Sequence, residues 1–523
     1  MSADTRKEFQ EKLDASRQQR KSERFRPVFH FTAPWGWSND PNGLCFWHGK
    51  WHLFYQHFYP EDTQPRWGHT VSTDLIHWED LPTAISPGPE TGSWSGATWV
   101  EADRVIAMYH GFESGNMVAV SSDENLLDWE KISGKTVVPN PLPIWLFTKG
   151  TETFNGKPLP EGALNVVYDP CIWKKGEYYY SISGGARRLP GVWKRHRQAF
   201  LFRSRDLKDW EYMHEFIEGD HFCYPGDDCG CPYFCPIGDK HILIHFTHRG
   251  SAHYMLGNYD TDRDKFHVID SGDFGFGNNF SGGIFAPTAF PDGKGGVILM
   301  LTLGCGHSDN GVGTCQVFSL PRRLTISGEQ LFMEPVETVE TLRMESKSLD
   351  VFTVPANTET VLDECPGNVA EIDLEVDFAS GKAEMFEVNI LRSPDSQEVT
   401  AIRFHHFGGC RVNDSVPDGM DNFGKANVES IISIDSSYSS ILPDTLSRMP
   451  ENAPFFIPAD ENLNMKIFID RSIVEVFVNG RQCAAIRVYP GREDSTGISF
   501  SARGGSATVK KCIFHKMENI WDK

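Results

Sequence analysis

Residues 45–55 read Cys-Phe-Trp-His-Gly-Lys-Trp-His-Leu-Phe-Tyr, which is two aromatic runs joined at His48-Gly49. Apolar and aromatic runs on both sides of a glycine turn are typical of a β-hairpin. The same pattern returns four more times, at irregular intervals of about 50 to 75 residues, and such intervals indicate a propeller or an array. These later hairpins cover residues 97–109, 171–180, 233–244 and 289–300. The chain therefore contains five related hairpins in its first two thirds.

Five hairpins, each continued by further short strands, predict a five-bladed β-propeller whose sheets surround a central channel. A second motif, a polar turn followed by Trp, trails three of the hairpins at 72–78, 122–129 and 204–210. We expect each of these Trp residues to pin the outer strands of its blade. The alternative is a long β-sandwich with accidental internal similarity.

Four of the five hairpins follow an Xaa-Pro step, namely Asp40-Pro41, Asp169-Pro170, Cys231-Pro232 and Ala286-Pro287. Proline is tolerated at the first residue of a strand, because no ladder donor is lost there. The four steps therefore predict the entry into the innermost strand of each blade. Since those strands line the channel, the residues at the four steps should converge at one of its mouths. Two of them are aspartates.

The sequence pattern changes after about Arg343, where apolar and polar residues alternate along short predicted strands, as in 371–376 and 465–469. A further hairpin is indicated by Asn479-Gly480, which follows the apolar run 474–478. We therefore predict an all-β chain. Its parts are a charged N-terminal extension (1–26), a five-bladed propeller (27–340) and a C-terminal β-sandwich (341–523). Helix is expected only in the extension and around 334–348, as a connector between the domains.

Charge and composition argue against several classes of partner and location. The net charge is −21 and no basic run stands out, which argues against a nucleic-acid partner. No apolar stretch approaches the length that spans a bilayer, and residues 1–26 lack the apolar core of a secretory signal, so neither a membrane partner nor export is expected. Many of the twelve cysteines lie within apparent strands, among them Cys45, Cys171, Cys483 and Cys512. Buried thiols in a reducing compartment, the cytoplasm, are the favoured interpretation.

The chemistry expected at the channel mouth follows from the two aspartates. In glycoside cleavage one carboxylate attacks the anomeric carbon while another group protonates the leaving oxygen. Asp40 and Asp169 are the candidates for carboxylates of this kind. Asp before Pro is also a common turn device, but its recurrence at equivalent blade positions favours a function.

Several segments of the sequence resemble those of glycoside hydrolase family 32, which contains invertases, fructanases and other β-fructofuranosidases. The similar segments span about Phe29 to Phe514 and occur in the family's order. They are Trp37–Gly43, Phe54-Tyr55-Gln56, Trp67-Gly68-His69, Asp74–Trp78, Trp94-Ser95-Gly96, Asp169-Pro170, Leu320–Leu324 and, in the C-terminal part, Ile469–Phe477.

The resemblance implies a retaining β-fructofuranosidase that hydrolyses terminal fructofuranosyl units of sucrose, fructo-oligosaccharides or fructans, with fructosyl transfer as a variant. It implies no cofactor and no metal. Asp40 matches the nucleophile, and Asp169 matches the carboxylate that stabilises the oxocarbenium-like transition state. Further matches hold the small-molecule sugar substrate by hydrogen bonds or stacking: Asn39, Gln56, Trp67, Trp94 and Ser95.

Two departures from the family pattern lie within this site. The family's acid/base glutamate precedes Cys-Pro, and Gly230 stands there instead. Side chains two residues apart on a strand face the same way, so we hypothesise that Asp228 is the proton donor, with Asp227 as runner-up. The second departure is Tyr168, which stands where the family usually places an arginine before Asp-Pro, and which we count among the substrate-binding positions.

Cys223, Cys229, Cys231 and Cys235, with His221, offer the ligand types of a zinc site. They lack paired Cys-x-x-Cys spacing, so buried thiols are the favoured interpretation.

Two alternatives remain for function. One is a catalytically impaired fructan-binding or sensor protein, because the usual acid is missing. The other is a related furanosidase that cleaves arabinofuranosides. A homodimer is compatible with the sequence.

Overall fold

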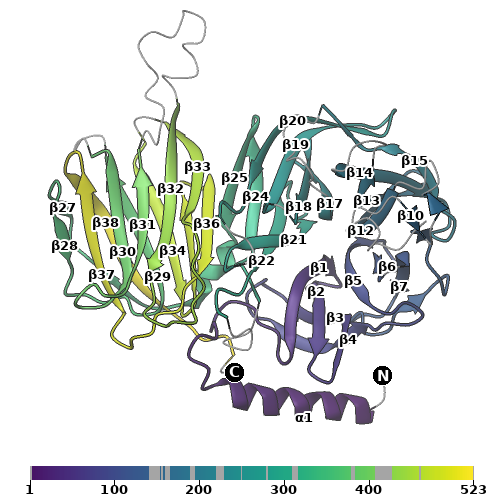
Figure 1. Cartoon of the computed structure of the whole chain (residues 1–523), viewed down its shortest axis with the longest axis horizontal. Coiled ribbons are helices and arrows are strands. Elements are labelled where there is room, and N and C mark those ends of the chain that lie inside the picture. The colour runs from purple at the N-terminus through teal and green to yellow at the C-terminus, as the bar shows by residue number, and fades with distance from the viewer. Residues whose placement is uncertain are drawn as a thin grey trace, which may run out of the picture.

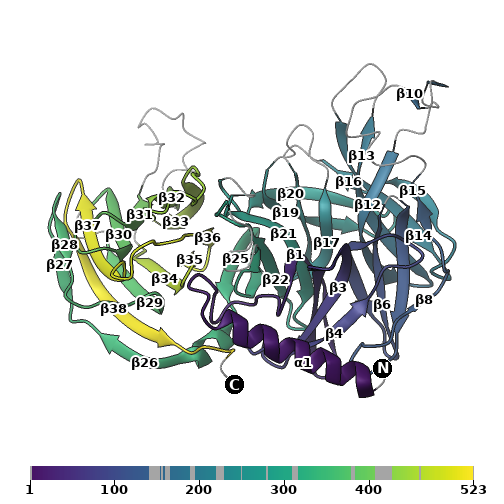
Figure 2. The same ribbon diagram turned by 60° about the horizontal axis from the view of Figure 1, so that its bottom comes forward.

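The protein is described by a computed structural model (Figure 1). The structure describes residues 3–112, 114–140, 153–154, 157–158, 165–188, 195–219, 229–248, 250–277, 281–308, 316–378, 383–406, 427–458 and 461–521. Two all-β domains lie side by side, a propeller and a sandwich, and a single long helix runs beneath the propeller (Figures 1 and 2). The predicted fold class is therefore confirmed.

The propeller is built from five sheets that follow one another along the chain, and their strands pair antiparallel except for β16, which pairs parallel with β20. The first contains β1 (Trp37–Trp47), β2 (Lys50–Tyr59), β3 (Asp62–Ser72) and β4 (Glu79–Ile85); the second β5 (Ser93–Val100), β6 (Val105–Gly111), β7 (Gly115–Ser121), β8 (Glu130–Lys131) and β9 (Val138–Pro139). The third contains β12 (Asn165–Lys175), β13 (Tyr178–Arg188), β14 (Arg195–Ser204) and β15 (Glu211–Glu215), and a separate small hairpin precedes it, β10 (Thr153–Phe154) with β11 (Lys157–Pro158).

The fourth sheet contains β17 (Gly230–Ile237), β18 (Lys240–Phe246), β19 (Ala252–Asp260) and β20 (Lys265–Asp273), with the short β16 (Ile217–Glu218) at its edge. The fifth contains β21 (Ile284–Pro291), β22 (Val297–Leu303), β23 (Val317–Phe318), β24 (Arg322–Ser327) and β25 (Gln330–Pro335). The first two strands of each sheet are the five hairpins predicted from the sequence. Their innermost strands β1, β5, β12, β17 and β21 contact one another in a closed ring, as a propeller requires.

The prolines do not mark the beginning of the inner strands, so that detail of the prediction is wrong. Pro41, Pro170, Pro232 and Pro287 lie inside β1, β12, β17 and β21, at or beside a shift in register with the second strand. A fifth shift interrupts β5 between Ser93 and Gly96. A β-bulge tolerates proline, because its extra residue leaves the ladder, and it re-aims side chains. Every inner strand therefore carries a bulge or irregularity near its beginning.

The polar turns before Trp connect the third and fourth strands of the first three blades. Leu75, Leu126 and Leu207 occupy equivalent places in these turns, and all three have positive φ, between 52° and 69°. The indole N–H of Trp129 donates to the carbonyl of Leu126 at 2.8 Å, and that of Trp210 donates to Leu207 at 3.0 Å. In these two blades the Trp residues fasten the turn itself.

The C-terminal domain consists of two sheets. One contains β26 (Arg343–Ser348), β27 (Phe352–Val354), β29 (Val369–Asp377), β34 (Leu463–Asp470), β35 (Ile473–Val478), β36 (Gln482–Arg487) and β38 (Ala507–Met517). The other contains β28 (Glu359–Val361), β30 (Met385–Arg392), β31 (Val399–His405), β32 (Asn427–Tyr438), β33 (Glu451–Pro458) and β37 (Gly497–Arg503). Their alternating apolar residues, such as Ile372, Leu374, Ile467 and Ile469, form a single buried core.

The two domains are joined by a fully buried polar network. Asp470 accepts hydrogen bonds from the backbone N–H groups of Val28, Phe29 and His30, at 2.7 to 2.9 Å. Glu475 pairs with Arg322 of the propeller at 3.0 Å and lies 3.1 Å from the His30 ring. Because each charge has partners, the network can stay buried. The Asp-Arg-Ser-Ile-Val-Glu stretch beginning at Asp470 thus fastens the sandwich to the propeller.

Helix α1 (Ala3–Arg20) makes up most of the charged extension, and it packs against the first blade. Leu13 is buried, Phe9 contacts Trp35 edge to face, and Lys12 pairs with Glu61 at 2.8 Å. The chain's C-terminus lies near the end of this helix (Figures 1 and 2). Around 334–348 the expected helix is reduced to one short 3₁₀ segment, η1 (Glu337–Leu342), followed directly by β26.

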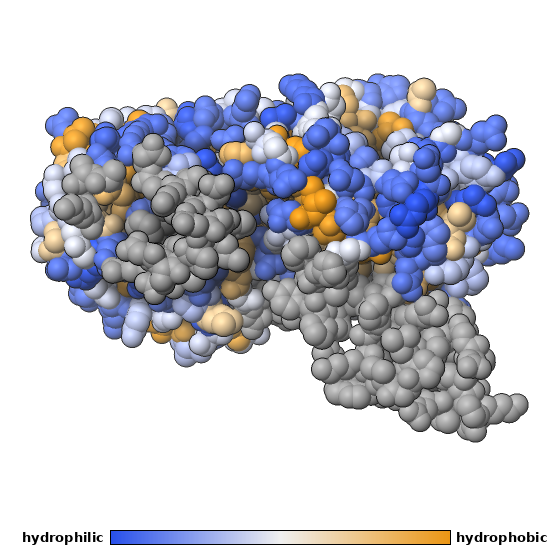
Figure 3. Space-filling view, turned by 90° about the horizontal axis from the view of Figure 1, so that it is seen from above, coloured by the Kyte–Doolittle hydropathy of each residue, from blue (hydrophilic) through white to orange (hydrophobic). Residues whose placement is uncertain are grey.

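The face seen in Figure 3 is mostly hydrophilic, with scattered apolar patches between charged side chains. Within the described chain, no helix is both long and apolar enough to cross a membrane. The described cysteines are all free thiols, and all but Cys365 are buried, which agrees with the prediction for Cys45, Cys171, Cys483 and Cys512.

Candidate active site

The bulges place the predicted site residues at one level of the channel. Asn39 and Asp40 occupy the bulge of β1, Trp94 and Ser95 that of β5, and Tyr168 and Asp169 that of β12. The equivalent place in β17 is occupied by Cys231 and Pro232. Because these strands touch in a ring, their bulges lie near one another, and the side chains of Asp40, Ser95, Asp169 and Cys231 meet.

Asp40 is the centre of this group and is only 7% exposed. Its Oδ2 accepts hydrogen bonds from Ser95 Oγ at 2.6 Å and from Gln56 Nε2 at 2.9 Å. Gln56 is held in turn by Asn39, whose Nδ2 donates to Gln56 Oε1 at 2.8 Å. Three of the predicted substrate-binding residues therefore form one network that fixes the Asp40 carboxylate.

Cys231 links the two carboxylates. Its Sγ lies 3.5 Å from Asp40 Oδ2 and 3.5 Å from Asp169 Oδ2, so these oxygens are at most twice that distance apart. Its backbone N–H donates to Asp169 Oδ2 at 3.0 Å. Burial and the charges of Asp169 and Asp40 raise the pKa of the Cys231 thiol well above its usual value, so the thiol stays protonated and can donate.

The electrostatics of Asp40 follow from its surroundings. Burial raises the pKa of its carboxyl group to about 6, and the negative charge of Asp169 acts in the same direction. The hydrogen bonds from Ser95 and Cys231 and the positive charge of the exposed His248 lower it. The carboxylate needed for nucleophilic attack therefore predominates above about pH 6.

The aromatic residues divide into buried and half-buried ones. Trp67 is fully buried, and its indole N–H donates to the carbonyl of Trp94 at 2.7 Å, so it supports the bulge of β5. Contact between Trp67 and a sugar stays a prediction. Trp94 is half-buried and packs near Phe58 and Phe112, and Phe58 stacks on Trp37 with ring centroids 5.6 Å apart. These half-exposed rings offer stacking surfaces near Ser95.

Gly230 has a steric reason to lack a side chain. It pairs with Phe246 across β17 and β18, and a Cβ atom added at Gly230 would lie 2.8 Å from Phe246 Cε1. The aromatic ring therefore crowds the place where a side chain at residue 230 would begin. β17 begins at Gly230, and the preceding Cys229 has φ of +50°. Asp227 and Asp228 lie outside the described residues.

Cys231 is a site residue that the sequence predictions do not include, since they treat it only as a buried thiol or zinc ligand. The signal was present, because Cys231-Pro232 is equivalent to Asp40-Pro41 and Asp169-Pro170 along the chain. Cys223 and His221 lie outside the described residues, while Cys229 and Cys235 are buried. Among the residues that the structure does describe, no group of three or more potential metal ligands is found.

A closed five-bladed propeller with two linked carboxylates at the bulges of its inner strands defines the class of propeller glycoside hydrolases. Comparison with known families makes this specific. Residues 30–335 match the glycosyl hydrolases family 32 N-terminal domain, and residues 338–516 match the glycosyl hydrolases family 32 C-terminal domain. The chain belongs to glycoside hydrolase family 32 and is a β-fructofuranosidase-like glycoside hydrolase.

The relatives agree with this assignment. A levanase of Bacillus subtilis is 26% identical over 95% of this chain and 71% of its own length. A sucrose-6-phosphate hydrolase of Zymomonas mobilis is also 26% identical, over 91% of this chain and 90% of its own. Among solved structures, fructan 1-exohydrolase IIa of Cichorium intybus has a TM-score of 0.75 at 21% identity, covering 95% of this chain and 98% of its own.

Proposed function

We propose that the protein is a retaining β-fructofuranosidase that releases terminal fructofuranosyl units from sucrose or fructo-oligosaccharides. The observation that carries this proposal is the environment of Asp40. Among described residues, every hydrogen bond to its carboxylate is accepted by Oδ2, from Ser95, Gln56 and the Cys231 thiol. Oδ1 is thereby left for attack on the anomeric carbon, while its partner oxygen fixes the orientation of the group.

In this mechanism Asp40 displaces the leaving alcohol and forms a covalent fructosyl ester, which water then hydrolyses with overall retention. Asp169, held by the backbone N–H of Cys231, places a negative charge beside the positive charge that develops on the sugar. Asn39 and the half-buried Tyr168 and Trp94 border the same group and are the proposed contacts for sugar hydroxyls and the ring face.

The leaving oxygen needs a proton, and we assign its donor to Asp228, which precedes the Cys229–Cys231 stretch in sequence. His248 is a second candidate, because its charge acts on Asp40 and its ring lies 4.8 Å from that of Phe246, which occupies the space beside Gly230. Asp228→Asn and His248→Gln should be compared on sucrose and on an aryl fructoside. The true donor is the residue whose loss abolishes sucrose cleavage but spares the aryl fructoside, whose leaving group needs little protonation.

The substrate itself is tested by product analysis with sucrose, sucrose 6-phosphate, inulin and levan, at low and high sugar concentration. Release of fructose from sucrose or short fructans supports the proposal, and longer fructosides formed at high concentration would show transfer. Binding of fructans without turnover of any fructoside, including the aryl fructoside, would instead support the sensor alternative.

A further inference from the structure

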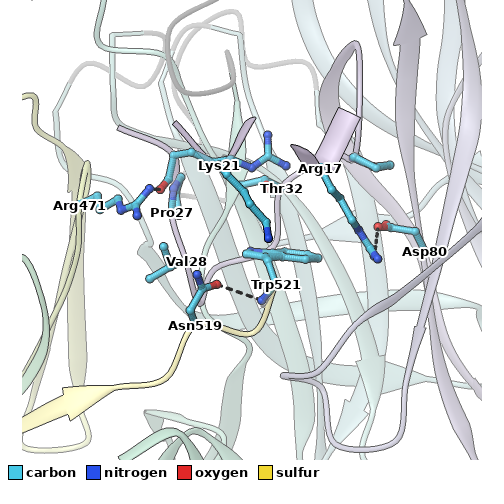
Figure 4. A pocket seen from close by; sticks show the side chains of 11 residues that line it. Arg17, Lys21, Pro27, Val28, Thr32, Asp80, Arg471, Asn519 and Trp521 are labelled. Carbon is cyan, nitrogen blue, oxygen red and sulfur yellow. Dashed lines mark hydrogen bonds and ion pairs between the residues drawn. The ribbon is translucent and has the colours of Figure 1, made fainter. Parts of the chain in front are cut away.

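A pocket of about 290 Å³, separate from the candidate active site, lies where the N-terminal helix, the first blade, the sandwich and the C-terminus meet (Figure 4). Arg17 of α1, Asp80 of β4, Arg471 of the β34–β35 turn and Trp521 beyond β38 all line it. Its volume is near the lower end of the range of about 300 to 1,000 Å³ that small-molecule sites occupy. None of its lining residues belongs to the candidate active site, so it would take a ligand of its own.

The charge of this pocket is opposite to that of the chain. Four cations line it, Arg17, Lys21, Arg26 and Arg471, against the single carboxylate of Asp80, although the whole protein has a net charge of −21. Basic side chains concentrated in a concave site attract anions, and guanidinium groups match the oxygens of phosphate and carboxylate.

Two of the cations keep most of their charge uncompensated. Arg471 donates to the main-chain carbonyls of Glu23 and Arg26, both at 3.0 Å, and these are neutral groups that fix its position. Lys21 makes no hydrogen bond or ion pair with any residue that the structure describes, and it lies directly after the last residue of α1. An anion in the pocket would meet an arranged guanidinium and a free ammonium group.

Several buried polar atoms of the lining also lack partners. Arg17 pairs with Asp80 at 3.3 Å (Figure 4), but Arg17 Nε and Asp80 Oδ1 have no hydrogen-bond partner among the described residues. The same holds for Thr32 Oγ1 and Trp521 Nε1. Thr32 is 1% exposed and the side chain of Asp80 is 1% exposed. Buried polar groups of folded proteins are nearly always paired, so these atoms point to a polar ligand.

We propose that this pocket binds a phosphorylated sugar. Its phosphate pairs with Lys21 and the neighbouring guanidinium groups, its hydroxyls exchange hydrogen bonds with Asp80 Oδ1 and Thr32 Oγ1, and its ring packs against Trp521. A bare anion would leave the carboxylate of Asp80 beside another negative charge, whereas a sugar hydroxyl donates to it. Since the lining comes from four separate parts of the chain, the bound ligand fastens α1 and the C-terminus to the two domains.

The experiment measures binding of glucose 6-phosphate to the full chain by calorimetry and by thermal denaturation, with glucose and inorganic phosphate in parallel. We expect one saturable site per chain, a melting temperature that rises with ligand concentration, and weaker binding of both glucose and phosphate. Lys21→Gln should weaken binding of glucose 6-phosphate about tenfold, because it removes a charge-assisted contact. Thr32→Val should weaken binding of glucose 6-phosphate but not that of phosphate.

The matched control is Lys7→Gln, which neutralises an exposed lysine of α1 that lies outside the pocket and pairs only loosely with Glu11 at 3.7 Å. Lys7→Gln should bind as the parent does, and all variants should keep their cleavage of sucrose, which shows that they are folded. The proposal is overturned if glucose 6-phosphate gives no saturable binding, if Lys21→Gln and Lys7→Gln bind it equally, or if inorganic phosphate binds as tightly as the sugar phosphate.

Discussion

Replacing Ser95 by alanine should move the acidic limb of the pH–rate profile upward. Ser95 Oγ donates to Asp40 Oδ2 at 2.6 Å, a short bond to a charged acceptor, and this bond lowers the pKa of Asp40 against the effect of burial. Hydrogen bonds to charged groups contribute about 1.5–3 kcal/mol, and one pKa unit corresponds to about 1.4 kcal/mol. The pKa of Asp40, about 6 in the parent, should therefore rise by roughly one to two units.

The sign follows from the role of Asp40. A nucleophile acts as the carboxylate, so a higher pKa means that a smaller fraction is active at a given pH. The measurement is kcat/KM against pH for an aryl fructoside, whose leaving group needs little protonation. Thr98→Val is the control, because Thr98 lies on the same strand and donates to Gly43 instead of a carboxylate. An acidic limb at the same pH in the Ser95→Ala variant and the parent would show that the Ser95 hydrogen bond does not lower the pKa of Asp40.

Three further changes test other parts of the account. Gly230→Ala should lower the free energy of unfolding by about 1–3 kcal/mol in denaturant titrations, because the new methyl group overpacks against Phe246, and Phe246→Leu should restore part of the loss. Asp169→Asn should reduce kcat about 100- to 1,000-fold with little change in KM, because its charge acts in the transition state; an effect on KM alone would contradict this. Glu475→Gln should cost about 3–5 kcal/mol of stability, because Arg322 loses its buried partner; an unchanged midpoint would contradict this.

The domain interface should also respond to pH. Burial alone would lower the pKa of His30, but hydrogen bonds and charges from Asp470 and Glu475 raise it above its ordinary value. A raised pKa in the folded state stabilises the protein fully below the unfolded pKa of about 6.5, and this stabilisation disappears as pH rises through the folded pKa. The melting temperature should fall over that interval in the parent but not in His30→Gln. An equal fall in both proteins would exclude His30 as the cause.

The propeller could be predicted because each of its hairpins is local in sequence. The run around His48-Gly49 contains both strands and the turn between them, and four repetitions of it specify the architecture. The bulges could not be predicted in the same way, since a shift in register depends on how β1 or β12 pairs with its neighbour. Proline indicates the correct position, but in the sequence a proline at a strand start is not distinguished from one at a bulge.

For the candidate active site, too, only features that are local in sequence could be predicted. Asp40 and Asp169 were identified because they recur at equivalent steps, and the structure brings them to the same thiol. The contact between Gly230 and Phe246 depends on the pairing of β17 with β18, so the sequence indicated only that a glutamate is missing. The hydrogen bonds between the two domains could not be predicted from the sequence either, because Asp470 lies 442 positions from Val28, whose N–H it accepts.

Trapping the covalent intermediate shows directly whether Asp40 is the nucleophile. The enzyme is mixed with an aryl fructoside, quenched in acid within the first turnover and digested, and the peptides are analysed by mass spectrometry. We expect one fructosyl unit attached to Asp40 in the peptide that contains Trp37–Trp47, and no such adduct in Asp40→Asn. A fructosyl adduct on another residue, or product of inverted configuration released without any adduct, would contradict it.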